Sequence, residues 1–558
     1  ALGYFALSAQ NNDSSNHNTA VGFTALEATT TGVFNVGVGS QALNANTTGA
    51  SNTGVGKDAL LNNTTGQFNV AVGKGSIETN TTGEKNVAMG TDTLASNTTA
   101  DNNTAVGNSA LFANTTGAGN TAVGSLSLDA NTTANNNVAI GYNSLTTNST
   151  GSSNTAVGTE ALKDNTTGTN NVAVGENALA NNTTASENTA VGQNAMLTNT
   201  TGANNVSMGH DSMRLSTTGD NNTGVGYDAL RSNTTGNENS AFGSAALDAN
   251  TTGIRNVAIG YQAMTGNTTA DNSTALGYAA LLVNSTGESN VSLGSGTLLS
   301  NTTADYNTAV GTNAMLLNTT GTQNVAVGSF SLDAQTTGDN NTIVGYGSGS
   351  AITTGGNNTI VGTSAGATLT TGGNCILIGR EANVSGANND ELVIGNSIAG
   401  KGNNTGLIYP PGGGGVHNAN NTTTWATTCD RRIKKNIKDN NTGLDVINKI
   451  QVKNFEYRTE DEIVDFENTA SAVVKKEGIQ LGVIAQEIET ILPNMVKTES
   501  TGVKTVDSDN LTWYLINAVK ELSKEIEELK KNSHKPKGLK DMDGYDELMA
   551  EIKNLKGE

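Results

Sequence analysis

Side chains capable of covalent or metal chemistry are sparse in this chain of 558 residues. Its four histidines lie far apart and lack metal-ligand spacing, so the sequence predicts no metal site and no cofactor. Its two cysteines, Cys375 and Cys429, are too few for a disulfide framework. Cys429 begins a strongly basic run that continues to Ile437. A cation close to a thiol lowers its pKa and favours the nucleophilic thiolate. The alternative interpretation of Cys429 is a small buried residue without chemistry.

A 17-residue repeat fills the chain before this run. Its Gly recurs without a slip from Gly22 to Gly379, which makes 22 copies in phase. Further copies around Gly3 and Gly395 flank this series slightly out of phase. Fixed self-similarity at a short period is typical of solenoids.

Numbered from its Asn, the repeat reads N-[TV]-A-V-G-x-x-A-L-x-x-N-T-T-[GA]-x-x. The first five positions predict a strand, with positions 2 and 4 on one face and position 3 on the other. The Ala-Leu pair predicts a second short strand or a single turn, and Asn-Thr-Thr-Gly predicts a turn. Two short strands and two turns make one coil of a β-solenoid, and the Asn at position 1 is expected to form hydrogen-bonded ladders. Such a rod of 22 coils would be roughly 105 Å long at ~4.8 Å per coil.

The charge is acidic and uneven. The net charge is −20, and residues 1–428 hold 9 Lys and Arg against 25 Asp and Glu, whereas residues 429–558 hold 21 against 25. This balance disfavours nucleic acid and anionic membranes as partners. No run of 18 apolar residues is present, so we expect no membrane insertion. The chain begins within a repeat and without Met, so we expect Ala1 to begin a fragment.

The composition divides the chain into four parts. We expect a repeat shaft at 1–395 and a Gly- and Pro-rich linker at 396–428, which contains the Pro-Pro pair 410–411. A small α/β domain follows at 429–531, and a short helical tail at 532–558 ends the chain. In the last two parts the periodicity predicts helices at 444–450, from 486 and at 545–555, and strands at 452–457 and 480–485.

One longer helix of this region has a regular apolar row. Leu515, Val519, Leu522, Ile526 and Leu529 follow one another in steps of four and three residues, with Glu and Lys between them. This spacing predicts a coiled-coil seam. Five positions are few, and a single surface helix is the alternative.

Two parts of the sequence resemble known families. The shaft repeat, N-[TV]-A-[VI]-G followed by x-x-A-L, resembles the head repeats of trimeric autotransporter adhesins and viral fibre shafts. This resemblance covers about residues 1–395 and implies a homotrimer. The basic run, together with Phe455, the block 482–487 and the block 492–496, resembles the intramolecular chaperone auto-processing domain. That domain ends endosialidases, phage tail spikes and tail fibres, and some membrane-bound transcription factors.

The second resemblance implies a self-cleavage site. The family motif is Ser-Asp-x-Arg-x-Lys, the chain is cut just before the Ser, and the Ser acts with the Lys. Here Cys429 replaces the Ser, so a thioester route could preserve cleavage, or cleavage is lost and the domain only chaperones. At most, the domain is a single-turnover self-cleaving peptidase, and no enzyme is expected in the shaft. The residues singled out are Thr428 and Cys429 at the scissile bond, Cys429 and Lys434 as the dyad, and Asp430, Arg432, Gln486 and Glu487 as supporting motif residues.

These observations favour a mainly β protein with a trimeric β-solenoid or β-roll rod and a small α/β chaperone domain that ends in a coiled-coil helix. The favoured function is a virion tail fibre or spike, located on the virion or outside cells, whose partners are its own copies and a host-surface receptor for adhesion. The alternatives are a bacterial trimeric surface adhesin and a purely structural extracellular filament with a non-cleaving chaperone.

Overall fold

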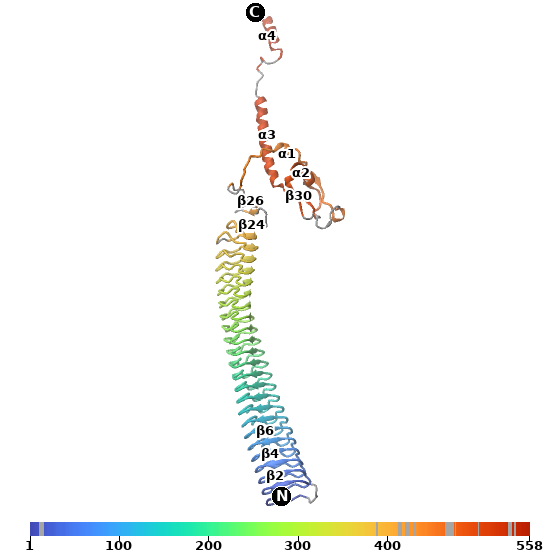
Figure 1. The fold of residues 1–558 in the computed structure, drawn as a ribbon, viewed down its shortest axis with the longest axis vertical. Coiled ribbons are helices and arrows are strands. Elements are labelled where there is room, and N and C mark those ends of the chain that lie inside the picture. The colour runs from blue at the N-terminus through green and yellow to red at the C-terminus, as the bar shows by residue number, and fades with distance from the viewer. Residues whose placement is uncertain are drawn as a thin grey trace. The chain divides into compact units, whose positions relative to one another are not determined.

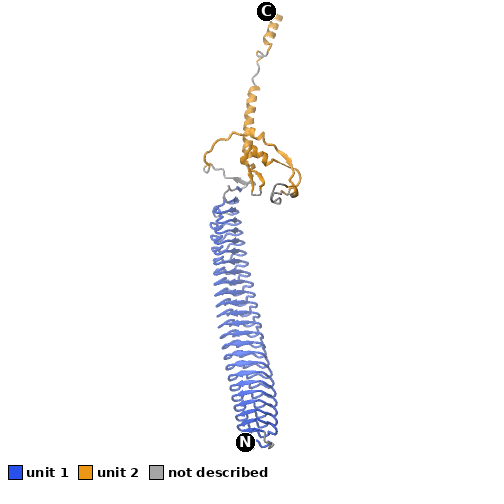
Figure 2. Ribbon diagram, turned by 45° about the vertical axis from the view of Figure 1, so that its right-hand side comes forward, with its two compact units in different colours: residues 1–428 blue, residues 429–558 orange. Residues whose placement is uncertain are grey.

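The structure is a computed structural model that describes residues 1–10, 16–386, 389–410, 416–418, 425–427, 431, 434–463, 474, 476–499, 502–533, 538, 540 and 543–557. The chain forms two compact units, residues 1–428 and residues 429–558, coloured blue and orange in Figure 2. Each unit is described by itself below.

The first unit is a column of stacked coils, which follows the chain from blue to yellow in Figure 1. Its first 22 strands have three residues each, start one repeat apart and pair in parallel with the strands of the adjoining coils, so that Thr19 lies beside Val36 and Val36 beside Thr53. The predicted β-solenoid is therefore confirmed. The strands are β1 Thr19–Val21, β2 Val36–Val38, β3 Thr53–Val55, β4 Val70–Val72, β5 Val87–Met89, β6 Thr104–Val106, β7 Thr121–Val123, β8 Val138–Ile140, β9 Thr155–Val157, β10 Val172–Val174, β11 Thr189–Val191, β12 Val206–Met208, β13 Thr223–Val225, β14 Ser240–Phe242, β15 Val257–Ile259, β16 Thr274–Leu276, β17 Val291–Leu293, β18 Thr308–Val310, β19 Val325–Val327, β20 Thr342–Val344, β21 Thr359–Val361 and β22 Ile376–Ile378.

The column ends in shorter coils and a small antiparallel part. β23 (Leu392–Gly395) and β24 (Gly406–Tyr409) continue the parallel stack. β25 (Val416–Asn418) and β26 (Trp425–Thr427) then pair antiparallel, β25 with β24 and β26 with β25. The parallel repeat thus stops within the stretch that the sequence identifies as a linker.

Each coil contains one strand, so the expectation of two short strands per coil is wrong. The Ala-Leu segment is a turn in which Thr24 and Leu26 have positive φ values of 49° and 53°. The Thr24 N–H donates to Tyr4 O at 2.9 Å, and the Leu26 N–H donates to Ala42 O at 3.0 Å. The left-handed residues break the extended backbone, yet the segment still bonds to the coils on both sides.

The interior of the shaft contains an apolar row and two polar ladders. Ala and Leu from positions 3, 8 and 9 are fully buried in most coils, as are Asn at positions 1 and 12. The Asn188 N–H donates to Asn171 Oδ1 at 3.0 Å, and Asn188 Nδ2 donates to Gly202 O at 2.9 Å. Asn199 Nδ2 donates to the same carbonyl at 2.9 Å and to Asn182 Oδ1 at 3.0 Å. The ladder predicted at position 1 is confirmed, and a second ladder runs beside it at position 12.

The second unit combines small sheets with helices. Its described helices and strands are α1 Leu444–Ile447, β27 Lys453–Phe455, η2 Glu460–Glu462, β28 Gln480–Gly482, α2 Ala485–Ile491, η4 Pro493–Met495, β29 Val496–Thr498, β30 Lys504–Val506, η5 Ser508–Asn510, α3 Leu511–Ser533 and α4 Tyr545–Lys556. β27 pairs antiparallel with β28, and β29 with β30. The helices and strands expected from periodicity are all present, with shorter strands and a shorter first helix than predicted.

Candidate functional site

The basic run that begins the second unit is described only in part. Lys434 is exposed, and its backbone N–H donates to Arg431 O at 3.2 Å. Thr428, Cys429, Asp430 and Arg432 lie outside the described residues. The scissile bond and the Cys429–Lys434 dyad therefore stay predictions.

Helix α3 holds the segment that follows this run. Asn517 Nδ2 donates to Asn440 O at 2.7 Å and to Thr442 O at 3.2 Å. Glu521 Oε2 accepts the Leu444 N–H at 2.7 Å. These two side chains bond to backbone groups that lie only a few residues after Lys434. Helix α3 therefore holds the segment that immediately follows the basic run.

Close packing reinforces this anchor. A Cβ built on Gly443 would overlap the backbone of α3 at Asn517 and Ala518, so the position tolerates only glycine without movement. Directly after it, Val446 of α1 is buried, as is Ala518 of α3. The helix predicted after the motif is present as α1, and it packs against α3.

The two supporting motif residues on α2 differ in role. Glu487 forms an ion pair with Lys453 and so links α2 to β27. Gln486, in the first turn of α2, is exposed. A second ion pair, between Lys504 and Glu489, links β30 to α2. Both ion pairs are partly exposed, so they orient the elements more than they stabilise them.

The apolar row of α3 is open to solvent in a single chain. Leu515, Val519, Leu522, Ile526 and Leu529 are between 42% and 68% exposed. The sequence correctly predicts one long helix here. Exposed apolar surface of this kind is typical of protein interaction sites.

Comparison with known proteins finds one family match, which lies in the second unit. Residues 429–497 match the family model for the chaperone of endosialidase. This chaperone region begins at Cys429, contains Lys434, Gln486 and Glu487, and ends within β29; α3 follows it. No curated protein and no solved structure gave a significant match. The chain thus carries an endosialidase-type chaperone region at the C-terminal end of a β-solenoid.

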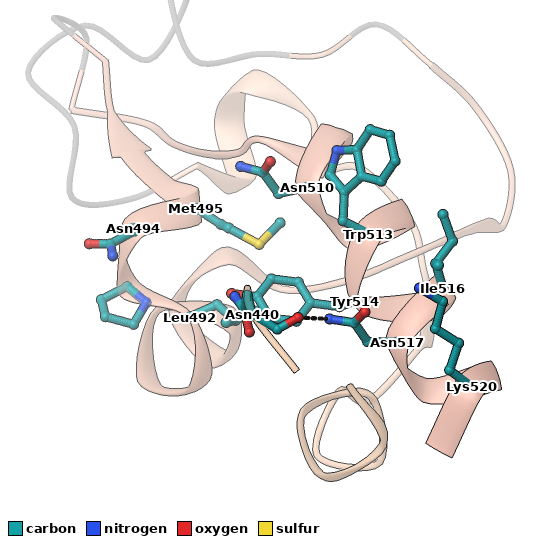
Figure 3. A pocket seen from close by; sticks show the side chains of 11 residues that line it. Asn440, Leu492, Asn494, Met495, Asn510, Trp513, Tyr514, Ile516, Asn517 and Lys520 are labelled. Carbon is teal, nitrogen blue, oxygen red and sulfur yellow. Dashed lines mark hydrogen bonds between the residues drawn. The ribbon is translucent and has the colours of Figure 1, made fainter. Parts of the chain in front are cut away.

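A pocket of about 620 Å³ lies between the end of the chaperone region and α3. Figure 3 shows the side chain of Met495 projecting toward Trp513 and Tyr514 of α3, and Leu492 also lines the pocket. No pattern in the sequence predicts this pocket, although Leu492 to Met495 belong to a block that resembles the chaperone family. Its described lining combines apolar side chains with the amides of Asn440, Asn494, Asn510 and Asn517, and it includes Lys520.

Other site chemistry is limited in the described residues. No cluster of three or more His, Cys, Asp or Glu there could hold a metal ion, and no helix there is long and apolar enough to cross a membrane. Between β27 and β28, a hydrogen bond from the Thr459 side chain lowers the pKa of the exposed Asp461. This carboxylate lies in η2, away in sequence from Lys434, and gives no support to the dyad.

Proposed function

We propose that this chain is a homotrimeric fibre protein whose C-terminal unit is an intramolecular chaperone for trimerisation of the shaft. The observation that carries the proposal is the chaperone region at 429–497, which follows a stack of uniform coils along the chain. The fibre is a virion tail fibre or spike, and its second partner is a host-surface receptor.

The uniformity of the shaft explains why it needs such a chaperone. Each coil pairs with the next in the same register, strand beside strand, throughout the stack. A slip of one coil between neighbouring chains would therefore preserve nearly every contact. The first coils are also costly to nucleate, because stability in a solenoid comes from contacts between coils. Chains joined at their C-terminal ends start in register and pass this barrier together.

The exposed row of α3 supports the joining role. Its spacing of four and three residues matches a coiled-coil seam, and its five apolar side chains need a partner. Asn517 and Glu521 of the same helix anchor the chain that follows the basic run. Assembly through α3 would therefore position the start of the chaperone region as well.

Self-release would follow the assembly of the shaft. The Cys429 thiolate attacks the carbonyl carbon of Thr428, the Thr428–Cys429 amide bond breaks, and the freed amine takes up a proton. Water then hydrolyses the thioester, which leaves a Thr428 carboxylate and restores the thiol. The Lys434 ammonium favours the thiolate and supplies the proton. The released shaft is held by its unfolding barrier.

Deletion of the second unit tests the chaperone role. We expect the full chain to form a particle of three subunits by light scattering, with any cleaved fragments separated only after denaturation. A chain of residues 1–428 should be insoluble or monomeric. A soluble trimer of the correct size from 1–428 alone would contradict the chaperone role.

Two substitutions test self-cleavage by intact mass and denaturing gels. Cys429→Ala and Lys434→Ala should each leave full-length chain, whereas Cys375→Ser, which changes the shaft cysteine, should leave the fragments unchanged. Fragments of the same size from the two dyad variants would place the cut elsewhere. A wild-type chain that stays intact would show a chaperone that does not cleave.

A further inference from the structure

The outer face of the strand column has a composition of its own. We call this the strand face: the side chains at positions 2 and 4 of the 22 repeats, from Thr19 and Val21 to Ile376 and Ile378. Position 4 is Val, Ile, Leu, Met or Phe in every repeat. Position 2 is Thr, Val, Ile or, once, Ser. Both rows point away from the buried position 3, because side chains alternate along a strand.

These side chains are left partly exposed. Within the middle coils, Met208, Phe242 and Leu276 are 41% to 44% exposed, whereas Ala241 between the two rows is fully buried. The row continues along the whole stack without interruption. A single chain therefore presents to water a strip with a continuous apolar row at position 4 and a mixed row of Thr, Val, Ile and one Ser at position 2.

Charged residues are absent from the two rows of the strand face. Between β1 and β22, all Asp, Glu, Lys and Arg residues fall at positions 6, 7, 10, 11, 16 or 17 of the repeat, and none falls at positions 2 or 4. An exposed strand on a monomeric protein would be expected to carry charged and polar residues over so many repeats. Depletion of charge at the centre of an apolar patch is typical of protein–protein interfaces.

Aromatic side chains border the strip on both sides. Tyr227, Tyr261 and Tyr278 stand at position 6, just past one end of the strand, and are more than half exposed. Phe34 and Phe68 stand at position 17, just before the other end, and are also more than half exposed. Tyr and Phe are enriched at interfaces, where their large surfaces become buried.

The size of the strip suits a stable interface. Twenty-two strands at ~4.8 Å spacing, each roughly 10 Å long, give roughly 1,000 Å² per chain. The position-4 row alone, about half of this area, is comparable with the largest apolar patches that monomers usually expose. The whole strip exceeds the ~800 Å² per partner of a standard interface.

We propose that the strand face is the surface through which the shafts of this protein contact one another, and that its occupants are further copies of the same chain in register. A partner must present apolar rows at the same spacing through 22 coils, and a second copy of this repeat does so. The inference rests on the proposed homotrimer and adds where in the shaft the copies meet.

The strand face also carries a register signal. Larger side chains concentrate in the middle of the stack, at Met208, Phe242, Ile259, Leu276 and Leu293, whereas most other coils have Val at position 4. In-register chains bring these large residues together at the same level. A slip of several coils would oppose them to smaller residues and leave gaps.

Single cysteines test the surface in the full chain. Val191→Cys places a thiol on the strand face at β11, and Thr201→Cys places one at an exposed position in the Asn-Thr-Thr-Gly turn. After mild oxidation, Val191→Cys should give covalent dimers on a denaturing gel at least ten times more abundant than those of Thr201→Cys. The parent chain, with its own two cysteines, sets the background.

A second pair tests the register. Tagged Val191→Cys chains co-assembled with untagged Phe242→Cys chains should give no mixed dimers, because the two levels are three coils apart, or roughly 14 Å. Mixed dimers as abundant as the like dimers would overturn the in-register arrangement.

Light scattering of the same samples separates the two proposals. Trimers that cross-link through Thr201→Cys and not through Val191→Cys would overturn the strand face as the contact surface and leave the trimer intact. Monomers whose Val191→Cys thiol reacts freely with a maleimide would overturn both the strand face and the proposed trimer.

Discussion

The two units of this protein bury their side chains in different ways. In the shaft, nearly every buried group meets an equivalent group in the adjoining coil, and the interior is filled from Ala20 to Leu407. In the described part of the second unit, the buried hydrophobic residues are Val446, Ile488, Met495 and Ala518. A coil is therefore completed by the neighbouring coils of its own chain, whereas the described part of the second unit buries few of its apolar side chains.

The two units therefore determine different properties of the assembly: the shape of one coil and the alignment between chains. Each coil of the shaft repeats the same core and ladders, so the shaft determines its own cross-section but determines the alignment between chains only weakly. The second unit has few internal contacts and a helix with a non-repeating sequence. A non-repeating partner surface can fix alignment, which a repeating one fixes only weakly.

The largest expected effect comes from breaking the apolar row of α3. Leu522→Glu with Ile526→Glu would place negative charges at two adjacent levels of the proposed seam, where they repel in an assembled trimer. We expect at least a tenfold loss of trimer and accumulation of insoluble shaft, measured by light scattering and by the soluble fraction.

The matched control places the same charges on the opposite side of α3. Lys524→Glu with Lys531→Glu should leave the trimer largely unchanged, because both residues are exposed and lie outside the apolar row. Equal loss of trimer in both variants would mean that net charge, and not the seam, controls assembly.

A smaller effect is expected from the shaft glycines, and it tests the idea that the coil is completed by its neighbours. Gly192 at position 5 has φ of 137°, and a Cβ there would overlap Gly209 O of the next coil. Gly192→Ala should therefore cost about 3 to 5 kcal/mol per chain and lower the melting temperature by about 5 °C. Circular dichroism on heating measures the shift.

Gly202→Ala is the control at position 15 of the same coil. A Cβ there would also approach the next coil, at Gly219 O, but the backbone of Gly202 is outside the left-handed region. Ala185 and Ala270 occupy this position in other coils and are buried there, so a small shift accommodates the methyl group. We expect a change of about 1 °C or less. Similar losses from both glycines would show that side-chain volume near the coil contact matters more than backbone conformation.

Much of the shaft could be predicted from its sequence because the same constraints recur in every coil. Gly at position 5 marks the end of each strand, and Asn at position 1 marks its start. At the Ala-Leu pair the sequence predicts either a second short strand or a single turn, and it does not decide between them, because Leu26 has a positive φ that its residue type does not indicate. Tertiary contacts impose that conformation: the Leu side chain fills the interior while its N–H bonds to the next coil.

The last regular coils show the same coupling between positions. In β20 and β21 the residue at position 3 is Ile343 or Ile360, and position 9 becomes Gly349 or Gly366. Side-chain atoms of Ile343 and Ile360 lie in the space that a Cβ on these glycines would enter. The interior volume is conserved although the residues exchange roles, and the pattern becomes interpretable only once positions 3 and 9 are known to face each other.

Less of the candidate site was predictable. The spacing of the apolar residues identifies α3, because a helical period is a local property. The hydrogen bonds from Asn517 and Glu521 to the backbone after the basic run are long-range, and backbone partners leave no sign in the sequence. The Cys429–Lys434 dyad stays a prediction from the family motif.

The smallest expected effect comes from the polar ladder at position 1, and it separates backbone satisfaction from side-chain packing within one coil. Asn188 Oδ1 accepts the Asn205 N–H at 3.0 Å, so Asn188→Ala leaves a buried donor unpaired. That should cost about 2 kcal/mol and lower the melting temperature by about 2 °C. Asn188→Ser should lose less than half as much, because Ser273 occupies the same position in its coil and its Oγ accepts the Asn290 N–H at 3.2 Å. Equal losses of stability for Ala and Ser would mean that the Asn side chains stabilise the coil by filling space. The difference between the shaft and the second unit would then be a difference in side-chain packing and not in hydrogen bonding.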